Sequence, residues 1–105
     1  MKLRIQPGKI VFRLAPEDVD ALVADGRIEV MVPTGPTQFQ YAIGLVNGPE
    51  IDLRFEDQIV ELGFPAHLIF EWSTTQKIGF HKDLGDLTVV VEKDLARRHK
   101  TSGGR

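Results

Sequence analysis

A chain of 105 residues that is 42% hydrophobic and 27% charged has the composition of one globular domain. It contains no cysteine, which excludes disulfides, thiolate catalysis and cysteine-bound zinc. A formal net charge of −2 argues against a nucleic-acid partner held by bulk charge. We also expect no membrane association and a cytoplasmic location, because no apolar run reaches the ~18 residues of a membrane span and no signal-peptide core is present.

The first predicted elements are two strands joined by the turn Pro7-Gly8. Apolar and charged residues alternate on both sides of this turn, which is typical of half-buried strands. If the turn is a two-residue loop, Ile5 faces Ile10 and Leu3 faces Phe12 on one side of the hairpin. The opposite side then carries the cations Lys2, Arg4 and Arg13.

A helix is predicted over residues 16–25, with Pro16 at its first position and Gly26 as its stop. Alternating apolar residues then predict strands over residues 28–32 and 39–45. A turn rich in proline and glycine separates these two strands.

The same pattern begins again about fifty residues after the start. Leu53-Arg54-Phe55, a turn at Glu56-Asp57 and a returning strand from Ile59 repeat the first hairpin, and Phe64-Pro65 repeats Ala15-Pro16. The sequence therefore predicts an internal repeat.

The second helix is predicted over residues 67–73, with Ile69, Phe70 and Trp72 in the core. Strands follow over residues 77–81 and 86–92. The last strand is nearly all apolar or β-branched, so we expect it to be central and covered on both faces.

The predicted order is ββα-ββββ-αββ, which is an α+β fold of two ββαββ halves. Eight mostly antiparallel strands of this length form a barrel or a strongly curved sheet, here with two short helices. We expect one α+β domain over residues 1–95 and a basic, disordered tail over residues 96–105.

Three strand arginines, Arg4, Arg13 and Arg54, are the candidate ligand-binding residues. Guanidinium groups bind phosphate or carboxylate through paired hydrogen bonds, so arginines that meet on one surface could hold an anion. The structural alternative is a solvated strand face whose cations protect a sheet edge from pairing.

No motif points to catalysis, a metal or a cofactor. The spacing of His67, His81 and His99 matches no metal site, and there is no nucleophile elbow or nucleotide-binding loop. We therefore predict no catalytic residue, no metal and no cofactor.

Five segments together resemble a family of short uncharacterised bacterial proteins: Met1–Ile5, Ile10–Leu14, the predicted helix Pro16–Gly26, Phe39–Ala42 and Val91–Asp94. Members of that family open with a K-I-R-I and R-L-R-L hairpin and close with V-E-K-D. The resemblance covers residues 1–95 and implies no assigned activity.

These observations favour a noncatalytic binding or interaction module of the bacterial cytoplasm over an enzyme. The alternative is a small enzyme or sensor that binds a phosphorylated or carboxylated ligand inside the barrel through the three arginines. A homo-oligomer is a third hypothesis, which depends on whether Phe70 or Trp72 is exposed.

Overall fold

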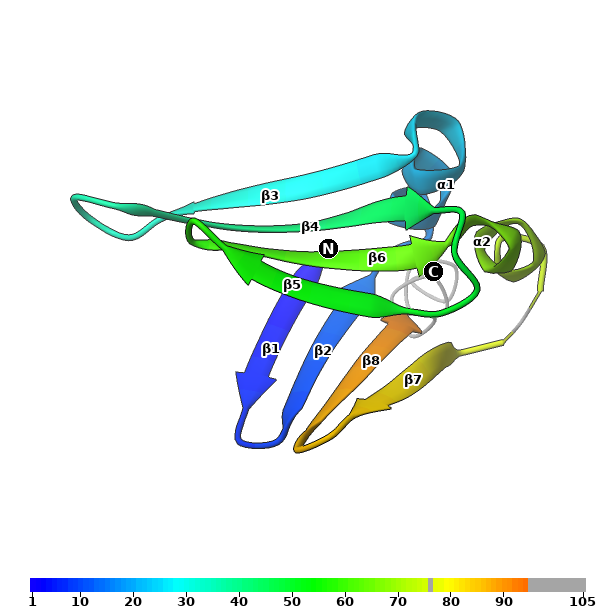
Figure 1. Ribbon diagram of the computed structural model, residues 1–105. Coiled ribbons are helices and arrows are strands. Elements are labelled where there is room, and N and C mark those ends of the chain that lie inside the picture. The colour runs from blue at the N-terminus through cyan, green and yellow to red at the C-terminus, as the bar shows by residue number, and fades with distance from the viewer. Residues whose placement is uncertain (76, 95–105) are drawn as a thin grey trace, which may run out of the picture. The chain divides into compact units, whose positions relative to one another are not determined.

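The computed structural model describes residues 1–75 and 77–94, and in this part of the chain the strands and helices follow the predicted order (Figure 1). The elements are β1 (Lys2–Gln6), β2 (Lys9–Leu14), α1 (Pro16–Asp25), β3 (Arg27–Pro33), β4 (Gln38–Val46), β5 (Asp52–Glu56), β6 (Ile59–Pro65), α2 (Ala66–Trp72), β7 (Gly79–Leu84) and β8 (Leu87–Lys93). The predicted tail over residues 96–105 lies outside the described residues. The chain divides into two compact units, one with β1, β2, β7 and β8 and the other with β3 to β6 and α2.

The eight strands form two four-stranded sheets, which corrects the predicted barrel or single curved sheet. Sheet A has the order β1-β2-β8-β7, and sheet B has the order β3-β4-β6-β5 (Figure 1). Each order ends in edge strands that pair on one side only, so neither sheet closes on itself. The barrel prediction was wrong because each half of the chain contributes one hairpin to each sheet, which divides the strands between two sheets.

The two sheets share one topology and one register. In the antiparallel pair β1–β2, Ile5 lies opposite Ile10, as predicted. In the antiparallel pair β5–β6, Phe55 lies opposite Val60, each 50 positions after its counterpart. The inner strand of each hairpin then pairs in parallel with a strand from the other half of the chain, β2 with β8 and β6 with β4. Pairings are thus mostly antiparallel, but the centre of each sheet is parallel.

One face of each sheet is buried. Its fully buried members include Phe12 and Val91 in sheet A, and Ile43 and Leu62 in sheet B. Strand β8 is central in its sheet, as predicted. The expectation that both its faces are covered was wrong, because Val90 on the opposite face keeps part of its surface exposed.

Helix α1 begins and ends where the sequence predicts. Gly26 follows its last residue with φ +77°, a left-handed conformation that glycine adopts without a Cβ penalty. Ala15 has no side chain able to cap the first turn. The carboxylate of Asp18 reaches back from the first turn, and its Oδ2 accepts a hydrogen bond of 2.8 Å from the backbone N–H of Ala15, which is one half of a capping box.

Helix α2 buries Ile69 and Trp72 and brings the Trp72 ring to 5.7 Å from the Phe64 ring, centroid to centroid. The prediction that Phe70 belongs to the core was wrong, since its side chain is 55% exposed. A three-residue spacing places Ile69 and Trp72 on one helix face and turns Phe70 away from it.

The turn between β5 and β6 holds two non-glycine residues in the left-handed region, Asp57 at φ +51° and Gln58 at φ +67°. It therefore lies one residue later than predicted. The first hairpin has glycine at the equivalent position, Gly8, at φ +78°. The change Gln58→Gly should raise the free energy of unfolding by about 1 kcal/mol, because it removes the steric penalty of a Cβ at positive φ. Urea unfolding followed by tryptophan fluorescence measures this gain.

The reciprocal change, Gly8→Ala, is the matched control. It should lower the free energy of unfolding by a similar amount, because alanine at this φ is strained. A Gln58→Gly variant no more stable than the parent would contradict the assigned turn conformation.

Candidate functional site

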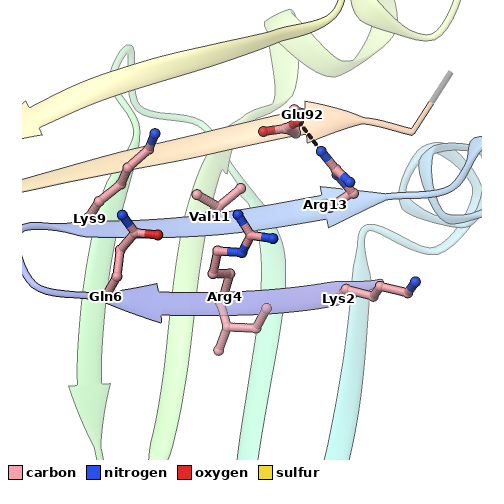
Figure 2. Close-up of a pocket in the computed structure, with 8 residues that line it drawn as sticks. Lys2, Arg4, Gln6, Lys9, Val11, Arg13 and Glu92 are labelled. Atoms are coloured by element: carbon pink, nitrogen blue, oxygen red, sulfur yellow. Dashed lines mark hydrogen bonds and ion pairs between the residues drawn. The ribbon is translucent and has the colours of Figure 1, made fainter. Parts of the chain in front are cut away.

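The outer face of sheet A carries the cations predicted for the first hairpin. Across β1 and β2, Lys2 lies opposite Arg13 and Arg4 lies opposite Val11. All three cationic side chains are exposed, and Lys9 joins them from the other end of β2. Figure 2 shows the Arg4 side chain reaching from β1 toward Val11, and the Arg13 guanidinium turned toward Glu92 of β8.

These side chains surround a hollow of about 240 Å³. Its lining residues are Lys2, Leu3, Arg4, Gln6, Lys9, Val11, Arg13 and Glu92 (Figure 2). Sites for drug-sized molecules occupy about 300–1,000 Å³, so this space suits a small group or one end of a larger ligand. We call this set of residues the sheet A hollow.

The charge of the sheet A hollow is strongly positive, with four cations and one carboxylate in its lining. Nη2 of Arg13 donates a hydrogen bond of 3.0 Å to Oε2 of Glu92. Among the described residues, no carboxylate forms an ion pair with Lys2, Arg4 or Lys9. Because exposed ion pairs are weak, Arg13 can exchange its hydrogen bond to Glu92 for one to a ligand.

Arg54 lies on sheet B and lines another hollow, of about 100 Å³. The other residues around it are Glu56, Asp57, Ile59 and Glu61. Three carboxylates against one guanidinium line this hollow, and one of them, Glu61, is also ion-paired with Arg27 at 3.2 Å, which leaves the surface acidic through Glu56 and Asp57. The structure thus brings Arg4 and Arg13 to one hollow and places Arg54 among acidic side chains.

The cations of the first hairpin are not a requirement of its fold. Fifty positions later, in the same register, Asp52 replaces Lys2, Ile59 replaces Lys9 and Gly63 replaces Arg13. Only Arg4 has a cationic counterpart, Arg54. Both hairpins form with the same strand pairing although their charges differ, so the pairing does not require cations at these positions. In sheet A these positions nevertheless carry a cluster of positive charge.

Two charged lining residues were missed by the sequence analysis. Lys9 could have been found, because a two-residue turn pairs it with Gln6 on the same face as Arg4. Glu92 could not, because it reaches Arg13 only through the parallel pairing of β2 with β8.

Neither of the described histidines joins the sheet A hollow. His67 is exposed on α2, and His81 is exposed on β7. In residues 1–75 and 77–94, histidine, aspartate and glutamate form no group of three or more that could hold a metal ion. Nor does the described part of the chain contain a helix with the length and apolar character needed to cross a membrane.

In a comparison with protein families, the model of DUF7009, a family of unknown function, matches residues 1–102, which is nearly the whole chain. The chain belongs to the DUF7009 family. This confirms the resemblance to an uncharacterised family, and DUF7009 has no assigned activity to transfer to the sheet A hollow. No curated protein and no solved structure was found to match the chain.

Proposed function

We propose that this DUF7009 protein is a noncatalytic binding module of the bacterial cytoplasm that recognises a phosphorylated or carboxylated group in the sheet A hollow. One observation carries the proposal: Lys2, Arg4 and Lys9 lie around one hollow with no ion-pair partner among the described residues. Unneutralised cations gathered on one surface attract and hold anions.

Each side chain has a definite role in this proposal. Arg4 and Arg13 present planar guanidinium groups, which donate paired hydrogen bonds to the oxygens of phosphate or carboxylate. Lys2 and Lys9 add point charges at opposite ends of the hairpin. Because all four side chains are exposed, affinity should fall as salt screens them.

A binding role accounts for the lining better than catalysis does. General acid–base chemistry needs a proton donor or acceptor beside the reacting atoms. Within residues 1–75 and 77–94, Glu92 is the only carboxylate that lines the sheet A hollow, and it is hydrogen-bonded to Arg13. The alternative was a small enzyme or sensor that encloses its ligand in a barrel. The strands form two open sheets, so the barrel interior that this alternative requires is absent from the described residues.

We further propose that the two ββαββ halves are copies of one unit, and that the sheet A hollow arose by divergence between them. The matching registers of β1–β2 and β5–β6 support this proposal. So does the contrast between the cationic outer face of one hairpin and the acidic outer face of the other.

Replacement of Arg4 by alanine should weaken the binding of inorganic tripolyphosphate or citrate by about tenfold or more. A hydrogen bond to a charged group contributes roughly 1.5–3 kcal/mol, and 1.4 kcal/mol corresponds to tenfold in affinity. Isothermal titration calorimetry at low salt measures the change, and a second titration at higher salt should show weaker binding of both proteins.

Arg54→Ala is the matched control, since Arg54 occupies the equivalent position of the second hairpin and is also exposed. It should leave the affinity unchanged. If neither anion binds the parent protein, or if both variants lose the same affinity, an anion site in the sheet A hollow is ruled out.

A further inference from the structure

The outermost strands β1 and β5 occupy equivalent positions in their sheets, and each leaves a large apolar side chain uncovered. Ile5 on β1 is 61% exposed and Phe55 on β5 is 67% exposed. The residues opposite them, Ile10 and Val60, are 4% and 5% exposed. In each hairpin the apolar residue on the inner strand is therefore buried, while the apolar residue opposite it on the edge strand is exposed.

The two edges also differ in charge. The outer face of the β1–β2 hairpin carries four cations. On the outer face of the β5–β6 hairpin, the edge strand β5 carries Asp52 and Glu56 with the single cation Arg54, and Glu61 on β6 is ion-paired with Arg27. Like charges on facing strands repel and unlike charges attract. Two copies of β1 would therefore repel each other, and so would the acids on two copies of β5.

We propose that β1 of one molecule pairs with β5 of a second copy of this chain. Edge strands carry unpaired backbone N–H and C=O groups, so the two edges can continue one sheet into the next. The pairing brings Ile5 and Phe55 onto one shared surface and sets the acids of β5 beside Lys2 and Arg4. The partner is thus a second copy of the chain, held through an edge that complements the first in charge and in apolar surface.

This pairing is head to tail. Each molecule that uses its β1 still offers a free β5, so association continues beyond the dimer unless the molecules close into a ring. The inference goes beyond the proposed anion site, and Ile5 and Phe55 are not among the residues that line the sheet A hollow.

Two single variants and their mixture test the pairing. Ile5→Lys removes the apolar contact from β1, and Phe55→Lys removes it from β5. In sedimentation velocity, the average mass of the parent protein should rise with concentration and exceed that of a dimer. Each variant should associate with an affinity about tenfold or more below that of the parent. An equimolar mixture should restore association but stop at the dimer, because Phe55→Lys still offers an intact β1 and Ile5→Lys an intact β5.

The mixture also shows that both variants are folded, because only folded edges can restore the dimer. Phe70→Lys, at an aromatic residue on α2 that is 55% exposed, is the matched control and should associate like the parent. Three results would overturn the proposal: a parent protein that stays monomeric at all concentrations, association lost in only one of the two edge variants, or a mixture that stays monomeric. A parent protein that associates in this way but binds neither tripolyphosphate nor citrate would overturn the proposed function alone.

Discussion

Truncation of Trp72 to alanine should lower the free energy of unfolding by about 3–5 kcal/mol, the usual cost of removing a large aromatic side chain from a core. Trp72 is 1% exposed and its ring centroid lies 5.7 Å from that of Phe64, so its loss leaves a cavity in the core. Domains of this size are stable by about 5–15 kcal/mol, so the variant should be close to unfolding. Urea denaturation followed by far-ultraviolet circular dichroism measures the loss without requiring the tryptophan signal.

Phe70→Ala is the matched control, because Phe70 lies two positions earlier on the same short helix. Its ring is 55% exposed, so its removal should change the free energy of unfolding by no more than about 0.5 kcal/mol. Similar losses for the two variants would contradict the orientation of α2.

Replacement of Gly79 by alanine should lower the free energy of unfolding by about 2–3 kcal/mol. A Cβ at this position would overlap the carbonyl oxygen of Val91 and lie 2.8 Å from Cα of Glu92. Both obstacles are backbone atoms of the central strand β8, so no side-chain rotation can relieve the clash. The β7–β8 pair must shift instead, which costs as much as overpacking a core.

Gly48→Ala serves as the control for Gly79, since a Cβ at Gly48 would meet nothing within 4 Å. Its free energy of unfolding should stay within about 0.5 kcal/mol of the parent value. Thermal unfolding of the three proteins gives the comparison directly. If Gly79→Ala unfolds at the same temperature as Gly48→Ala, the close approach of β7 to β8 is not present in solution.

The sequence predicts local structure well where two signals coincide. Alternation together with Pro7-Gly8 predicts the register of the first hairpin, and Pro16 together with Gly26 predicts the bounds of α1. Where only one signal is present, the prediction is less accurate. The second turn has no glycine, and it was placed one residue early.

The assignment of strands to sheets could not be read from the sequence. The central pair of sheet A joins Phe12 to Val91, and no pattern within either strand indicates the partner. Such pairing depends on packing between segments distant along the chain, whereas periodicity reports only the local element. The sequence therefore predicts one barrel or strongly curved sheet, whereas the eight strands form two sheets.

The residues of the candidate site could be predicted where they depend on local pattern, and not where they depend on which strands pair. Arg4 and Arg13 follow from alternation within one hairpin, which is local information. Arg54 was grouped with them because it occupies the equivalent place in the second hairpin, yet equivalent places lie on different sheets. The place of Glu92 in the site depends on the pairing of β2 with β8, which the sequence does not indicate.

The parallel pairing at the centre of sheet A has a consequence during synthesis of the chain. Sheet B uses one continuous stretch, from Arg27 to Pro65, so its strands are synthesised one after another with no strand of the other sheet between them. Sheet A joins β2, which ends at Leu14, to β8, which begins at Leu87. A ribosome adds about 5–20 residues each second, so β2 waits roughly 4–15 seconds for its central partner. During that interval the apolar side chains of the first hairpin are without the strand that later lies beside them, and sheet B can form before sheet A is complete.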